Sequence, residues 1–65
     1  MNDKSLTLLK VLLIRAAQTE GATREQAALL ADEAIRPHLY APVTEERTLA
    51  MFDEVETAAR SATQR

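Results

Sequence analysis

Cysteine and tryptophan are absent from the 65-residue chain, and glycine, phenylalanine and tyrosine each occur once. Without cysteine the chain forms no disulfide and no thiolate metal site. This composition fits a reducing compartment, so we expect a cytoplasmic protein. The single histidine, His38, argues against a histidine-based zinc site, because zinc takes several nitrogen or sulfur ligands. We therefore expect no metal and no other cofactor.

The shortage of glycine and histidine also bears on catalysis. One glycine cannot form a glycine-rich phosphate-binding loop. Nucleophilic catalysis needs a nucleophile, a base and an orienting group. The two serines, Ser5 and Ser61, fall near expected helix ends, and His38 is the only histidine that could assist them. The sequence predicts that the chain is not an enzyme.

Neither an excess of positive charge nor a long apolar run is present. Eight Lys and Arg against ten Asp and Glu give a formal net charge of −2, which supplies no general attraction to nucleic acid. The apolar stretch 6–14 contains Lys10 and falls well short of the roughly 20 residues that a membrane helix needs. We expect no membrane span and regard nucleic acid as the less favoured partner.

What the chain does contain is a modest amount of apolar surface. Hydrophobic residues make up 46% of the sequence, but many are alanines, which bury little area each. A chain of this length forms one domain with a small core. Domains of this size are usually stabilised by disulfides, metals or association. With the first two excluded, association with another chain is the expected source of additional stability.

Gly21, Pro37 and Pro42 divide the chain into three segments with helical periodicity. Thr23 and Gln26 have the spacing of a capping box, and Thr44 is a favourable cap for the last segment. No segment alternates as a strand would. The sequence therefore predicts an all-α, small three-helix domain over 1–65, with helices at about 4–19, 23–38 and 44–62.

The first helix is apolar on more than one side. A broad face comprises Leu6, Leu9, Leu12, Leu13, Ala16 and Ala17, extended by Leu8, while Val11 and Ile14 point to the other side. A helix that is apolar nearly all round is normally buried on several sides, and two short companion helices cover only one. We predict a homodimer with the first helix at its centre. The candidate interface residues are Leu8, Val11, Leu12, Ile14, Leu29 and Leu49.

A second set of residues is expected to contact another protein. Arg36, Leu39 and Tyr40 lie in the connection between the second and third helices, and tyrosine and arginine are frequent interface anchors. The alternative for Leu39 and Tyr40 is that they fold back and seal the core. On the third helix, the candidates for a partner contact are Arg47, Asp53 and Glu54.

Residues 23–31 resemble the first helix of helix-turn-helix regulators, which often begins with a Thr-x-x-Gln-x-Ala pattern. The resemblance covers nine residues and implies DNA binding as an alternative function. The chain departs from that family because no tight three- or four-residue turn follows and because Glu45 and Glu46 would repel phosphates.

The favoured hypothesis is a small helical protein–protein interaction module. Specifically, we expect an inhibitor or modulator that binds a bacterial host regulatory or machinery protein, as phage- or plasmid-type accessory proteins do. A non-catalytic subunit of a larger complex is a further alternative.

Overall fold

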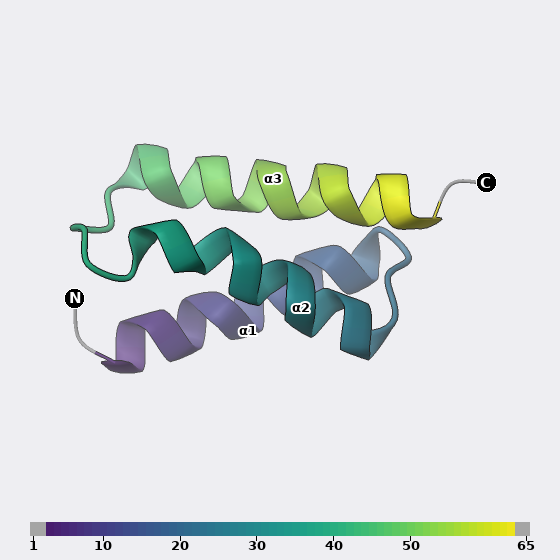
Figure 1. The fold of residues 1–65 in the computed structure, drawn as a ribbon, viewed down its shortest axis with the longest axis horizontal. Helices are drawn as coiled ribbons and strands as arrows, with labels where there is room; N and C mark the ends of the chain where they lie inside the picture. The colour runs from purple at the N-terminus through teal and green to yellow at the C-terminus, as the bar shows by residue number, and fades with distance from the viewer. Residues whose placement is uncertain (1–2, 64–65) are drawn as a thin grey trace.

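A computed structural model describes residues 3–63, and for residues 3 and 4 the backbone only. Three long helices lie side by side, with α1 and α3 parallel and α2 antiparallel to both (Figure 1). The described residues contain no strand, which confirms the all-α, three-helix prediction. The elements are α1 at Asp3–Thr19, α2 at Arg24–Ile35, a short 3-10 helix at Arg36–His38, and α3 at Glu45–Thr63.

The turn between α1 and α2 follows from two local features of the sequence. Gly21 has a φ of +104°, a conformation that a side chain would strain. Around it, Ala22 N–H donates to the Ala17 carbonyl at 3.1 Å and Gly21 N–H donates to the Gln18 carbonyl at 3.0 Å, which is the Schellman arrangement. The predicted capping box is also confirmed, because the Gln26 N–H donates to Thr23 Oγ1 and the Thr23 N–H donates to Gln26 Oε1, both at 3.1 Å.

The second connection begins where Pro37 interrupts the helical hydrogen bonding. The regular helix ends at Ile35, three residues before the expected end at 38, and the chain tightens into the 3-10 helix. Proline has no N–H and disfavours helical geometry in the residue before it. The cap predicted for the third helix is confirmed, since the Arg47 N–H donates to Thr44 Oγ1 at 3.2 Å. The connection at 36–44 is longer than a helix-turn-helix turn.

The core is narrow and rich in alanine. Its largest fully buried side chains are Leu13, Met51 and Val55. On each helix the buried positions recur at intervals of three or four residues, as one face of a helix requires. They are Leu9, Leu13 and Ala17 on α1, Ala27, Ala31, Ala34 and Ile35 on α2, and Met51, Val55 and Ala59 on α3, together with Ala22 in the first turn.

The face that α1 buries differs from the expected one. Leu12, expected on the covered face, is 43% exposed, and Leu8 is 62% exposed. Ile14, expected on the uncovered side, is half-buried against the core. The covered strip of α1 is centred on Leu13 and is shifted toward Ile14, and α2 presents mainly alanines to the core. The uncovered side of α1 therefore carries Leu8, Val11 and Leu12.

Candidate interaction surfaces

Three leucines and one phenylalanine form an apolar face along α1 and α3. Leu8 and Leu12 lie one turn apart on α1, and Leu49 of α3 is 63% exposed. Phe52, one turn after Leu49, is half-buried. We call Leu8, Leu12, Leu49 and Phe52 the apolar face. Val11, 46% exposed, borders it on α1.

Two ion pairs establish which sides of α1 and α3 these residues occupy. Lys10 pairs with Asp32 of α2, so the α2 side of α1 carries Lys10, and Leu8 and Leu12 lie away from it, toward α3. Arg60 of α3 reaches Glu20 at the end of α1, and Leu49 lies three helical turns before Arg60 on the same side of α3.

The contact between Glu20 and Arg60 also shows which residues of α1 and α3 lie at the same height along the bundle. Glu20 and Arg60 are 40 positions apart in the chain, and α1 and α3 run parallel (Figure 1). At that offset, Leu8 lies at the level of Leu49 and Leu12 at the level of Phe52. The apolar face is therefore continuous across the two helices.

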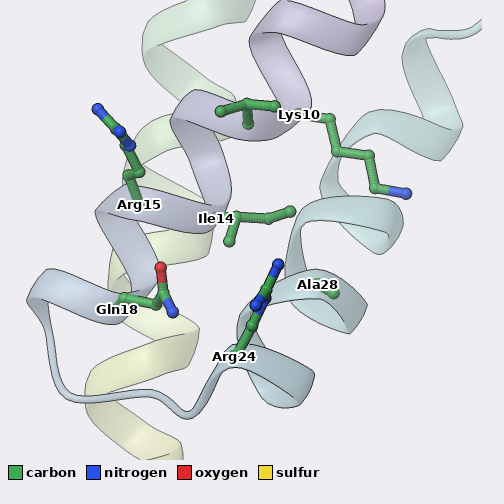
Figure 2. A pocket seen from close by; sticks show the side chains of 7 residues that line it. Lys10, Ile14, Arg15, Gln18, Arg24 and Ala28 are labelled. Carbon is green, nitrogen blue, oxygen red and sulfur yellow. The ribbon is translucent and has the colours of Figure 1, made fainter.

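A cationic groove lies on the other side of α1, between α1 and α2. It has a volume of about 610 Å³. In Figure 2, Lys10 and Arg24 extend across the space between the helices, Ile14 lies between them, and Arg15 projects outward from α1. The groove is lined by Lys10, Val11, Ile14, Arg15, Gln18, Arg24 and Ala28.

The cations of the groove differ in their partners. Lys10 Nζ lies 2.8 Å from Asp32 Oδ1, and the hydrogen bond from Lys10 lowers the pKa of the Asp32 carboxyl below its ordinary value of 3.8. Within residues 3–63, Arg15 and Arg24 have no carboxylate within 4.0 Å. The groove thus combines an apolar floor with two guanidinium groups that have all their donors available.

The ion pair of Arg60 with Glu20 lies at the end of the bundle where α1 ends. Arg60 Nε and Nη2 donate to the two carboxylate oxygens of Glu20 at 3.1 and 3.2 Å, and Glu56 lies 3.6 Å from Arg60 Nη2. The hydrogen bond from Arg60 lowers the pKa of Glu20, and the same contact raises the pKa of Arg60. This pair joins the end of α1 to α3 across the surface of the bundle.

The six predicted dimer residues do not form one surface. Leu8, Leu12 and Leu49 belong to the apolar face, Val11 borders it, and Ile14 lies in the groove. Leu29 is 66% exposed but lies on the side of α2 opposite its buried alanines. A flat interface centred on α1 therefore takes in Leu8, Leu12 and Leu49 and leaves Leu29 outside.

The predicted partner-binding residues fall into two groups. Arg36 and Leu39 are exposed beside the 3-10 helix, and Tyr40 is fully exposed, so Tyr40 does not seal the core. Arg47 is half-buried near the start of α3, at the same end of the bundle. Asp53 and Glu54 are exposed farther along α3, on its outer side.

Sequence reasoning missed the groove and its two arginines. The sequence pattern singles out neither arginine, since Arg15 directly follows the apolar stretch 6–14 and Arg24 lies within the segment 23–31. Their proximity depends on how α1 and α2 align after the turn at Gly21. The opposite charges of Lys10 and Asp32 were the one available signal for that alignment.

The described part of the chain offers no obvious centre for chemistry. No group of three or more His, Cys, Asp or Glu side chains in it is arranged to hold a metal ion. His38 is half-buried, and its Nδ1 atom has no hydrogen-bond partner among the described residues. None of the described helices is long and apolar enough to cross a membrane.

Comparison with known protein families, curated proteins and solved structures yields no match for the chain. The two surfaces, the apolar face and the cationic groove, are therefore the basis for its proposed function.

Proposed function

We propose that the chain is a small helical protein–protein interaction module that forms a homodimer with α1 at its centre. The observation that supports this most directly is the exposure of Leu8, Leu12 and Leu49, which lie at similar levels on the parallel helices α1 and α3 (Figure 1). Burying a leucine side chain completely is worth about 1.5–3 kcal/mol. A two-fold interface would bury the face of each copy against the other.

The charges on α1 favour one orientation of the two copies. Arg15 lies one turn after Val11 on the exposed side of α1. Parallel packing of α1 on its counterpart would bring Arg15 close to Arg15 of the other copy, which is repulsive. Antiparallel packing centred near Val11 and Leu12 separates the two Arg15 side chains, which then lie at opposite ends of the interface.

Within this proposal, the module acts by occupying a surface of its partner, as an inhibitor or modulator does, rather than by performing chemistry. We place it in the cytoplasm because a chain without cysteine suits a reducing compartment.

Sedimentation equilibrium over a concentration series tests the homodimer. We expect the mass to rise from 7.2 kDa toward twice that value. Leu8→Glu should keep the chain monomeric, because the new carboxylate would be desolvated in the interface. Leu13 is unsuitable for this test, since it is fully buried and its replacement by glutamate would unfold the monomer.

Leu29→Glu is the matched control, because Leu29 is as exposed as Leu8 but lies on the outer side of α2. It should leave the association unchanged, and circular dichroism should show that both variants remain helical. A folded monomer at every concentration, or equal disruption by both variants, would contradict the proposal.

A further inference from the structure

The cationic groove is a second surface, separate from the apolar face, and its lining residues favour a particular class of ligand. Ile14 and Ala28 form an apolar floor between α1 and α2, Arg24 extends from α2 toward Ile14, and Arg15 borders the groove on α1 with its side chain directed outward (Figure 2). Arginine binds carboxylates through two parallel hydrogen bonds, which gives both affinity and orientation. A ligand that fits has apolar atoms for the floor and carboxylates for the two guanidinium groups.

The distribution of charge distinguishes α1 from the other helices. By sequence, α1 contains three cationic residues, Lys4, Lys10 and Arg15, and one acidic residue, Asp3. By contrast, α3 carries five carboxylates and two arginines, although the whole chain has a net charge of only −2. Arg24 extends the positive region across the groove onto α2. The groove is therefore a local positive site on an acidic protein.

We propose that this groove binds an acidic amphipathic helix of a partner protein. The groove follows α1 from Lys10 to Gln18, a length of about 12 Å at 1.5 Å per residue. That length accommodates about two helical turns. An apolar side chain of the partner contacts Ile14 and Ala28, and carboxylates on either side pair with Arg15 and Arg24.

A protein helix suits the groove better than a nucleic acid does. The floor is apolar, whereas a phosphate backbone gains nothing from Ile14 or Ala28. Glu25 and Glu33 of α2 are exposed and are not among the residues that line the groove, and a duplex long enough to reach them would bring its phosphates near these carboxylates.

This inference rests on the proposed function only in that both treat the chain as an interaction module, because the groove and the apolar face use different residues apart from the bordering Val11. The probe is a fluorescein-labelled amphipathic peptide with leucines at helical spacing and glutamates on both sides of them. A peptide with lysines in place of the glutamates serves as the ligand control. We expect saturable binding of the acidic peptide by fluorescence anisotropy and no saturable binding of the basic one.

The double variant Arg15→Gln/Arg24→Gln should weaken binding of the acidic peptide at least tenfold, because it removes both charge-assisted contacts to the peptide carboxylates. Its matched control is Ala50→Glu/Thr57→Glu, which changes the net charge equally at two exposed positions of α3, outside the groove. The control should bind within about threefold of the unmodified chain, as expected for distant surface charges.

Several results would overturn the groove assignment. Equal weakening by both double variants would indicate general electrostatic attraction, and absence of saturable binding would exclude this ligand class. Binding of duplex DNA that depends on Arg15 and Arg24 would make the groove a nucleic-acid site.

Sedimentation of the same variants separates this proposal from the homodimer. The groove variant should still dimerise, and Leu8→Glu should still bind the peptide. Loss of dimerisation in the groove variant would mean that a second copy occupies the groove, which contradicts the assignment of an acidic partner. Peptide binding by a chain that stays monomeric would support the groove and contradict only the homodimer.

Discussion

At the scale of single residues, the contact between Glu20 and Arg60 joins parts of the chain that the sequence does not pair. The i,i+4 pair of Glu56 with Arg60 follows from helical spacing and is present at 3.6 Å. The shorter, bidentate contact of Arg60 with Glu20 depends on the arrangement of α1 and α3. It is also the contact that sets the level of Leu8 relative to Leu49.

The lowered pKa of Glu20 makes this contact dependent on pH. Its ordinary pKa is 4.5, and the bond to Arg60 lowers it in the folded chain. The folded state therefore binds this proton less readily than the unfolded state does. The stabilisation is complete above pH 4.5 and is lost as the pH falls through 4.5 toward the lower folded value.

We therefore expect Glu20→Gln to reduce the free energy of unfolding slightly at pH 7, because the pair is exposed to solvent. The difference from the unmodified chain should be smaller at pH 3 than at pH 7. Urea denaturation at the two pH values measures it. Glu54→Gln, which removes an exposed carboxylate without an ion pair among the described residues, should show no such change. A deficit that persists undiminished at pH 3 would show that Glu20 acts by some means other than its charge.

At the scale of helices, the start of α2 depends on the capping box at Thr23. Its hydroxyl accepts from Gln26 N–H at 3.1 Å, which satisfies one of the free donors of the first turn. We expect Thr23→Ala to lower the free energy of unfolding by about 1 kcal/mol, within a range of 0.5–2. Urea denaturation followed by circular dichroism measures this change.

The matched control for the cap is Thr57→Ala. Thr57 is exposed in the middle of α3, where alanine has the higher helix propensity, so this substitution should be neutral or slightly stabilising. Should the two variants lose equal stability, the capping box would not be responsible for the loss at Thr23.

The bounds of the helices were predictable because local chemistry sets them. Gly21, Thr23 and Thr44 act through hydrogen bonds to residues within five positions, and Pro37 acts through its own ring. The covered side of α1 was not predictable to the same degree. Leu12 and Ile14 have similar hydrophobicity, yet Ile14 packs against the core and Leu12 is 43% exposed. Which of them is covered depends on how the helices pack, which the pattern of a single helix does not contain.

The two candidate surfaces also differ in how far the sequence predicts them. Leu8 and Leu49 were identified from the sequence because an apolar side chain off the main stripe is visible in the pattern. The groove was not identified from the sequence, because Arg15 and Arg24 line the same groove only when α2 folds back on α1. A cluster built from two helices requires their register, and the register follows from tertiary contacts such as Lys10 with Asp32.

At the scale of the whole molecule, the small core connects stability with association. Among the described residues, only Leu13, Met51 and Val55 are large and fully buried, and the remaining core is mainly alanine. Each alanine contributes little burial, so we expect a folded monomer of low stability. A partner that binds only the folded chain raises its apparent stability by mass action.

The midpoint of thermal unfolding should therefore rise with protein concentration, because a second copy of the chain is such a partner. Leu8→Glu should keep its helical circular dichroism at low temperature but unfold at a midpoint that is independent of concentration. Leu13→Ala should lower the midpoint at every concentration, since deleting buried methyl groups costs about 2–5 kcal/mol, while its dependence on concentration remains. The two leucines lie on the same helix, so this contrast separates the part of α1 that folds the monomer from the part that joins two monomers. If the unmodified chain had a constant midpoint over a hundredfold range of concentration, the apolar face would not be a site of self-association.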